Sequence, residues 1–301
     1  MGRGLSKSLN KIYGRNNLIL TDISDPLPED KPLGMFLKLD VTEKENFANF
    51  VKEHKITNII HLASLLSASC EKNLDLAQKI NIQGLHNALK IAKDFKTQIF
   101  IPSTIATFGP NLEKRPLPDD VVQDPITYYG ISKIYMEKLG AYYYNKFGVD
   151  FRSLRYPAII SPYEFACNGT ATYPTELIHS ALKAQKYKMY LEPHIKLPMM
   201  YIDDCIRGTI EFIGANNLNL TRRTYNFNGL SFSPEEYLAE VKKVLQVDVE
   251  YEIDNLRNRI ALTWPVSLDD KIATRDWGWK PNVSNTKELV DIMVRDTQQT
   301  H

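Results

Sequence analysis

The chain has few cysteines and no long apolar run, and both absences exclude whole classes of protein. Its 301 residues include only Cys70, Cys167 and Cys205, an odd and widely spaced set that fits neither a disulfide framework nor a zinc site. We therefore expect a reducing compartment. No stretch reaches the roughly 18 to 20 uninterrupted apolar residues that a membrane helix needs, so we expect no membrane-spanning segment.

An excess of charge of one sign is absent too. The chain has 37 Lys and Arg residues against 36 Asp and Glu residues, and 43% of its residues are hydrophobic. This balance provides no polyanion-binding surface, and no cluster of basic and aromatic residues suggests a nucleic-acid partner. The composition is that of a globular protein with one large domain or two unequal ones.

The histidines give no indication of a metal site, because their spacing matches no motif of metal ligands. They are His54, His61, His86, His179, His194 and His301. The first residues, from Met1 to Leu5, lack the apolar core of a signal peptide, and no targeting segment is visible in the chain.

Short apolar runs alternate with stretches of helical period up to residue 155, as in βαβ units around a parallel sheet. This pattern predicts strands at 17–22, 34–39, 57–62, 97–102 and 150–155. It predicts helices at 43–54, 71–94 and 128–147, the first opened by a capping box of Thr42 and Glu45. We therefore predict an α/β fold with a Rossmann-type doubly wound parallel sheet.

The pattern becomes irregular after residue 156, which predicts a smaller C-terminal α+β part over 157–301, with some segments returning to the sheet of 1–156. The expected elements are helices at 173–185 and 203–214, a strand at 223–228, and a helix opened by Ser233-Pro234-Glu235-Glu236. The proline-rich segment 108–127 is expected to be a loop, and long loops in compact domains often carry function.

Tyr129 and Lys133 are the most informative pair in the chain. Four residues apart on a helix, their side chains lie on the same face, one turn from each other. A free tyrosine has a pKa of about 10, and a nearby ammonium lowers this pKa by favouring the phenolate. The pair is therefore a candidate for taking a proton from an alcohol, although the same spacing on its own also occurs on ordinary helix surfaces.

Ser103 and Thr104 strengthen this hypothesis. They follow the apolar strand at residues 98–102, so their hydroxyls lie at the carboxyl end of a strand, where open α/β sheets bind their ligands. Hydroxyl, phenol and ammonium together form a set that can handle a proton. A simple strand-ending role for the two residues is the alternative.

Two acidic residues also end predicted strands. Asp22 follows residues 17–21, a position that in dinucleotide-binding folds binds the ribose hydroxyls of the adenosine. No Arg or Lys occurs within Ile23-Ser24-Asp25, which favours NAD over NADP. Asp40 ends the next strand and is a candidate for the adenine amino group, with a turn or N-cap role as an equal alternative.

The glycine turn that should precede these strands is incomplete. A complete dinucleotide domain begins with a strand and a glycine-rich turn that brings backbone N–H groups to the pyrophosphate. Gly2 and Gly4 head a helical stretch that runs into the strand of Asp22. We therefore expect that Gly2 is the last glycine of this turn and that the first strand is missing from the chain.

Taken together, these residues resemble the extended short-chain dehydrogenase/reductases, in which Ser or Thr, Tyr and Lys act as placed above. More closely, several runs resemble the short-chain family of L-threonine 3-dehydrogenases. They are residues 65–68, 81–87, 102–105, 108–110, 197–205 and 276–279. The runs extend over nearly the whole chain in the family's order, so the set is far more specific than any single run.

The resemblance implies NAD as cofactor and L-threonine as substrate, oxidised at its C3 hydroxyl to 2-amino-3-ketobutyrate. It implies that Tyr129 is the general base, Lys133 holds the ribose and stabilises the phenolate, and Thr104 or Ser103 positions the substrate hydroxyl. The implied cofactor-binding residues are Gly2, Asp22, Ile23, Asp40, Val41, Leu62, Ala63, Ser64, Asn81, Tyr129, Lys133 and Pro157. The implied substrate-binding residues are Ser67, Thr104, Tyr129, Gly169, Thr170 and Trp264.

The chain departs from the family's pattern at three places. Ala171 stands where a second threonine is usual, and Ala158 follows Pro157 where a glycine is usual. With the incomplete glycine turn, these departures predict weaker binding of threonine and NAD. The alternatives are therefore a nucleotide-sugar epimerase or dehydratase, disfavoured because Leu197-Pro198 lacks the usual arginine, and a non-catalytic pseudoenzyme.

The resemblance also implies a homodimer formed by the helices at 71–94 and 128–147. Tyr135, Leu139, Tyr142 and Tyr143 are candidates for this interface, with packing onto the chain's own core as an equally good alternative. The implied compartment is the mitochondrion in a eukaryote and the cytoplasm in a bacterium.

Overall fold

The computed structural model describes residues 1–110, 112–113, 115–163 and 169–299, and the chain divides into two compact units. The first unit comprises Met1–Thr107, Ile126–Leu154 and Ile206–Tyr225. The second comprises Phe108–Pro125, Arg155–Cys205 and Asn226–His301. The predicted boundary at residue 156 divides the chain into two continuous parts, whereas each unit is assembled from three separate stretches. The boundary stays a prediction.

The first unit is built on parallel strands, as the sequence predicts. The strands are β1 (Ile19–Asp22), β2 (Met35–Lys38), β3 (Asn58–Ile60), β4 (Gln98–Phe100), β5 (Ser103–Thr104), β6 (Phe151–Tyr156) and β10 (Thr224–Asn226). Strands β10, β6, β4 and β3 are neighbours in that order, with β5 also paired to β6, while β1 and β2 form a separate parallel pair. In that pair Asp22 lies opposite Lys38.

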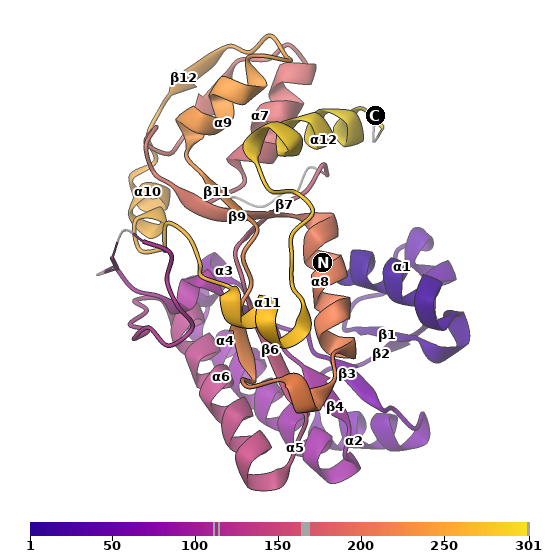
Figure 1. Ribbon diagram of the computed structural model, residues 1–301. Coiled ribbons are helices and arrows are strands. Elements are labelled where there is room, and N and C mark those ends of the chain that lie inside the picture. The colour runs from indigo at the N-terminus through magenta and orange to yellow at the C-terminus, as the bar shows by residue number, and fades with distance from the viewer. Residues whose placement is uncertain (111, 114, 164–168, 300–301) are drawn as a thin grey trace. The chain divides into compact units, whose positions relative to one another are not determined.

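Helices connect these strands. They are α1 (Gly2–Tyr13), α2 (Lys44–Glu53), α3 (Ser67–Lys72), α4 (Leu74–Ala77), the π-helical η3 (Gln78–Gly84), α5 (Leu85–Phe95), α6 (Tyr128–Phe147) and α8 (Ile202–Gly214). Short 3-10 turns are η1 (Arg15–Asn17), η2 (Pro28–Leu33), η4 (Ile105–Thr107) and η5 (Asn217–Asn219). Helix α5 packs between α2 and α6 (Figure 1).

Two local expectations are wrong. The helix predicted at 71–94 is interrupted at Asn73, because the backbone of this residue is not helical and its side chain caps α4 by accepting from the Leu76 N–H. The capping box of Thr42 and Glu45 does not form. The Thr42 N–H and hydroxyl both donate to the Asp40 carboxylate at 2.8 and 2.7 Å, so helix α2 starts later, at Lys44.

Close packing fixes α6 against the sheet. The core of the first unit includes buried side chains of α2, α5, β4 and β6, among them the fully buried Phe151. A Cβ atom at Gly140 of α6 would lie only 2.3 Å from the ring of Phe151. A glycine is therefore required at this position if the helix is to approach the strand so closely.

The second unit has its own sheets and core. Its strands are β7 (Ala158–Ile160), β9 (Leu197–Tyr201) and β11 (Leu230–Phe232), with β8 (Tyr187–Met189) paired to β12 (Val249–Tyr251). Its helices are α7 (Tyr173–Leu182), α9 (Pro234–Val241), α10 (Asn255–Ala261), α11 (Lys271–Trp277) and α12 (Thr286–Gln298). Helix α9 begins with the predicted capping box of Ser233 and Glu236. This mixture of helices and short strands agrees with the predicted α+β character.

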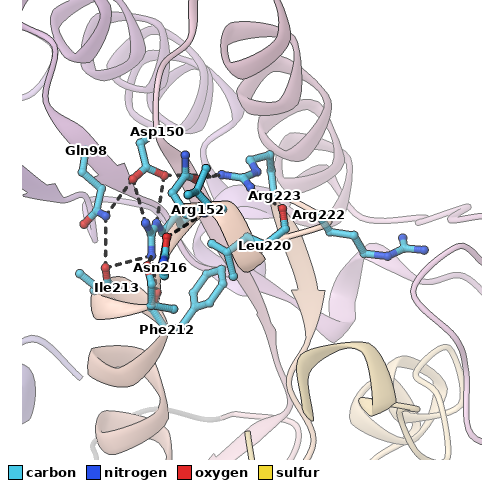
Figure 2. Close-up of polar contacts among 12 residues, drawn as sticks. Gln98, Asp150, Arg152, Phe212, Ile213, Asn216, Leu220, Arg222 and Arg223 are labelled. Atoms are coloured by element: carbon cyan, nitrogen blue, oxygen red, sulfur yellow. Dashed lines mark hydrogen bonds and ion pairs between the residues drawn. The ribbon is translucent and has the colours of Figure 1, made fainter. Parts of the chain in front are cut away.

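A buried arginine ties the end of α8 to the sheet of the first unit. The Arg152 guanidinium donates to the carbonyls of Phe212, Ile213 and Ala215 at 2.7 to 3.0 Å, where α8 ends (Figure 2). It also forms two hydrogen bonds of 2.9 Å with the Asp150 carboxylate. Burial raises the pKa of Asp150, but the bonds from Arg152 and from Gln98 outweigh it and lower this pKa overall.

We predict that replacing Arg152 by methionine lowers the free energy of unfolding by about 1 to 3 kcal/mol, because three helix-end carbonyls lose their donor and the half-buried Asp150 carboxylate loses two hydrogen bonds. Urea unfolding followed by circular dichroism measures this loss. The control is Arg295→Met, since Arg295 forms an exposed ion pair with Asp296 and its loss is expected to change stability little. Equal stability of the two variants would contradict the role of Arg152.

Candidate functional site

The candidate site lies where β4 leaves the sheet and α6 begins. Ser103 and Thr104 form the short strand β5 directly after β4, and η4 follows them. Helix α6 starts at Tyr128, because Thr127 adopts an extended backbone and its hydroxyl accepts from the Gly130 N–H at 3.1 Å. The cap therefore places Tyr129 in the first turn of the helix and Lys133 one turn later.

The Tyr129 side chain is buried. Burial, and after it negative charge at Cys70, raises the pKa of this phenol well above its ordinary value. The expectation that Lys133 lowers the pKa of Tyr129 is therefore wrong for this arrangement. The reason is that desolvation of the phenolate outweighs the nearby charge.

The Lys133 ammonium lies beneath the tyrosine ring. Its Nζ is 5.6 Å from the centre of the Tyr129 ring and donates a hydrogen bond of 2.8 Å to the Pro102 carbonyl. Burial lowers the pKa of Lys133 to about 8, while negative charge at Cys70 and Glu137 would raise it. The Lys133 ammonium is therefore shielded from water, and in such an environment one charged neighbour changes its pKa strongly.

The two adjacent hydroxyls at the end of β4 have different partners. The Thr104 hydroxyl accepts from the Ala106 N–H at 3.2 Å, whereas the Ser103 hydroxyl donates to the Glu137 carboxylate at 2.5 Å. Glu137 is a buried residue that the sequence reasoning missed. Its position four residues after Lys133, on the same helix face, is the signal that would have identified it.

The Asn81 side chain connects two segments that lie next to the site. Its side chain accepts from the Leu65 N–H at 2.8 Å, donates to the Leu65 carbonyl at 3.0 Å, and donates to the Ser132 hydroxyl of α6 at 3.4 Å. The amide therefore holds the turn after β3 against α6. A small cavity beside it is lined by His61, Ala63, Ser64, Asn81, Leu85, Ile101, Ser132, Lys133 and Met136.

The acidic candidates lie at the ends of β1 and β2. Asp22 and Ile23 are exposed, and the Asp22 carboxylate accepts from the Ser24 N–H at 2.9 Å. One oxygen of Asp40 is used by Thr42, as the alternative turn role requires, and the Val41 carbonyl accepts from the Asn87 side chain. An exposed carboxylate at a strand's carboxyl end suits a ribose diol.

Gly2 and Ser67 are two further candidate residues of the first unit. Gly2 is the first residue of α1, and a Cβ there would meet Leu62 at an ordinary 3.6 Å, so the space around this position does not demand a glycine. Ser67 begins α3.

Pro157, Gly169, Thr170 and Trp264 belong to the second unit. The Gly169 carbonyl accepts from the Thr172 hydroxyl at 3.1 Å, and Trp264 packs against that unit's apolar core. Ala171 is buried in the same core. The neighbouring Asn168 and Cys167 lie outside the described residues.

Within the described ranges, His, Cys, Asp and Glu form no group of three that could hold a metal ion. In the same part of the chain no helix is both long and apolar enough to cross a membrane.

The fold agrees with comparisons to known proteins. The sequence profile of the NAD dependent epimerase/dehydratase family matches residues 2–227, and the chain belongs to this family. This family membership implies a nicotinamide cofactor, and an exposed acceptor such as the Asp22 carboxylate is chemically suited to ribose hydroxyls.

Relatives in this family are more specific. The mitochondrial L-threonine 3-dehydrogenase of Bos taurus is 43% identical over 98% of this chain and 79% of its own length. The crystal structure of L-threonine dehydrogenase from Phytophthora infestans has a TM-score of 0.92 at 40% identity, covering 99% of this chain and 95% of that one. A monomeric L-threonine 3-dehydrogenase from a metagenome has a TM-score of 0.91 at 35% identity, covering 98% and 95%.

We predict that His61 makes the protein less stable as the pH falls from about 6.5 to about 4. Burial, and then the charge of Lys133, lowers the pKa of His61 to about 4. Between these two pH values the unfolded chain therefore binds a proton at His61, whereas the folded chain does not. This difference removes about 3 kcal/mol across that pH range. Above about pH 6.5 His61 is neutral in both the folded and the unfolded chain, so this loss of stability is absent.

The measurement is urea unfolding of the parent and of His61→Gln at several pH values. The variant is expected to lose less stability than the parent on acidification, and His194→Gln, at an exposed histidine, is expected to follow the parent. Parallel curves for His61→Gln and the parent would show that His61 is protonated in the folded protein.

Proposed function

We propose that the chain catalyses the NAD-dependent oxidation of the C3 hydroxyl of L-threonine to 2-amino-3-ketobutyrate. The observation that carries this proposal is the buried pair of Tyr129 and Lys133, with the Lys133 Nζ 5.6 Å from the centre of the tyrosine ring. The kinship with threonine dehydrogenases over nearly the whole chain supports the choice of substrate. A nucleotide-sugar substrate lacks comparable support, because the related epimerase structure is only 20% identical and indicates the fold alone.

In this proposal residues of α6 and β5 have different roles in the oxidation of the substrate hydroxyl. Tyr129 takes the hydroxyl proton, Thr104 orients the hydroxyl, and Lys133 stabilises the phenolate through its charge. The bound nicotinamide supplies the acceptor for the hydride. Burial keeps the phenol protonated in the unliganded chain, so this role requires that the Lys133 charge stabilise the phenolate once substrate and cofactor are bound.

We further propose NAD rather than NADP, and the exposed Asp22 carboxylate is the main reason. A carboxylate at this position accepts hydrogen bonds from the ribose hydroxyls and repels a 2′-phosphate. Lys38 lies opposite Asp22, but its ammonium is paired with Asp25 at 2.9 Å. The other proposed cofactor-binding residues are Gly2, Ile23, Asp40, Val41, Leu62, Ala63, Ser64, Asn81, Tyr129, Lys133 and Pro157.

The proposed substrate-binding residues rest on the resemblance alone. They are Ser67, Thr104, Tyr129, Gly169, Thr170 and Trp264. For the compartment, the mitochondrial relatives favour the mitochondrion if the source is eukaryotic, whereas bacterial relatives favour the cytoplasm if it is bacterial.

We expect the protein to reduce NAD when L-threonine is added, and we expect Tyr129→Phe to lower kcat/KM by roughly 10² to 10⁴-fold, because the proton acceptor is lost. Absorbance of NADH measures the rate, and calorimetry measures NAD binding separately. Tyr13→Phe, at an exposed tyrosine in α1, is expected to retain the parent's rate.

The outcomes separate three functions. NAD reduction that depends on threonine and on Tyr129 supports the dehydrogenase. NAD binding without threonine oxidation overturns the proposed substrate and calls for nucleotide sugars to be tested. Folded protein that binds no NAD would identify a non-catalytic relative.

We also propose a homodimer formed through α5 and α6. Of the four candidates, Leu139 and Tyr143 pack onto the core of their own unit, whereas Tyr135 and Tyr142, with 39% and 51% exposure, are available for such an interface. Ile131, on the same helix, is also exposed.

Analytical ultracentrifugation tests the homodimer. We expect a dimer for the parent and a monomer for Tyr142→Glu, because a carboxylate buried in an apolar interface lacks a partner. Val122→Glu, at an exposed loop position, serves as the control. A monomeric parent, like the metagenomic relative, would overturn the proposed assembly.

A further inference from the structure

A turn at residues 169–172 comes directly before α7 in the second unit. Its two inner residues differ in their surroundings. Ala171 is buried in the apolar core of the unit, whereas Thr170 is half-buried. Among the described residues no hydrogen-bond partner is present for the Thr170 hydroxyl. The turn therefore directs one side chain into the core and leaves the neighbouring hydroxyl available for a ligand.

The hydroxyl of Tyr190 binds both ends of this turn. Tyr190 follows β8 and is itself buried, with 6% exposure. Its oxygen accepts from the Thr172 N–H at 3.0 Å and lies 3.1 Å from the Thr172 hydroxyl. Its O–H donates to the Gly169 carbonyl at 3.3 Å. One phenol therefore connects the first and the last residue of the turn.

The Thr172 side chain is also held from α7. Its hydroxyl donates to the Glu176 carboxylate at 2.5 Å, and the other oxygen of this carboxylate accepts from the Tyr187 hydroxyl at 2.8 Å. A Cβ atom at Gly169 would lie 2.8 Å from the methyl group of Thr172, which could move away only by giving up these bonds. The turn is therefore tight, and it requires a glycine at its first position.

An arginine packs against the ring of Tyr190. The guanidinium carbon of Arg257, in α10, lies 4.3 Å from the centre of this ring, which is a cation–π contact. Phenylalanine offers a similar ring face, so Tyr190→Phe keeps this contact and removes only the hydroxyl. The hydrogen bonds to the turn can thus be tested apart from the packing of the ring.

We propose that Tyr190 is a positioning residue for the substrate: by holding Gly169 and Thr172, its hydroxyl fixes the turn so that Thr170 is presented to the substrate. This inference rests on the proposed function, in which Gly169 and Thr170 bind L-threonine. A turn that is fixed before binding loses little conformational entropy when the ligand arrives, and this raises the affinity. Ala171 then removes no substrate contact, because its side chain belongs to the core.

The first test measures the turn itself, without substrate. Amide hydrogen exchange at Thr172 in the full chain is followed by mass spectrometry with fragmentation to single residues. We expect Tyr190→Phe to raise this exchange rate roughly five- to tenfold, because the N–H loses its acceptor. Tyr201→Phe is the matched control. Tyr201 is a buried tyrosine of the same unit whose hydroxyl donates to Asp296, so its loss should leave Thr172 at the parent's rate.

The second test measures the reaction. In Tyr190→Phe the KM for L-threonine should rise roughly tenfold, with kcat and the Kd of NAD near the parent's values, because the loss falls on substrate binding. Thr170→Val should also raise KM, and adding Tyr190→Phe to it should raise KM little further, since the tyrosine acts through the threonine. Tyr201→Phe should keep the parent's KM. A purely structural role for Tyr190 would instead give independent effects that multiply in the double variant.

An unchanged exchange rate at Thr172 in folded Tyr190→Phe overturns the proposal, and so do independent effects of the two substitutions on KM. If Tyr190→Phe does not fold, Arg257→Met decides. The ring then loses its cation and keeps its hydroxyl, so exchange at Thr172 should rise by a smaller factor, and no rise counts against the proposal. If the parent does not oxidise threonine, the proposed function fails, while the exchange experiment still shows whether Tyr190 holds the turn.

Discussion

A buried ammonium at the carboxyl end of a parallel strand is the constraint on which this site depends. Taking a lysine charge out of water is costly, and the Pro102 carbonyl compensates part of this cost by accepting a hydrogen bond from the Lys133 ammonium. The pKa of Lys133 still falls to about 8, so the compensation is incomplete. Because the pKa of this ammonium lies close to neutral pH, its protonation changes readily when another group binds beside it.

The packing of α6 makes this arrangement possible. Gly140 lets the helix approach Phe151 of β6, and the cap at Thr127 decides which residue begins the first turn. The end of β4 brings two hydroxyls to the same helix face, while Asn81 holds the turn after β3 against Ser132. The site is therefore rigid because its parts belong to helices and strands whose backbones are fixed elsewhere. At the end of the same strands away from the site, Arg152 performs a comparable task for α8 (Figure 2).

The acid–base behaviour of Tyr129 shows the limit of reasoning from spacing. A lysine four residues away suggests a lowered pKa, yet burial raises it, because desolvation acts on every buried charge whereas the ammonium is only one neighbour. The same limit applies to the long helix predicted at 71–94. Its apolar period is genuine, but Asn73 caps a new helix there and a π-helical turn follows, which periodicity does not reveal.

The sequence by itself determined the parallel α/β fold, the helix that carries Tyr129 and Lys133, and the hydroxyls that end β4. These features depend on local apolar patterns and on spacing along one helix or strand, both of which can be read from neighbouring residues. Only the tertiary structure decided that the Lys133 ammonium lies near the Tyr129 ring, that Ser103 donates to Glu137, and that burial sets the pKa of the phenol and of the ammonium. Those properties depend on which groups from distant segments share a space without water, and no single stretch of sequence contains that information.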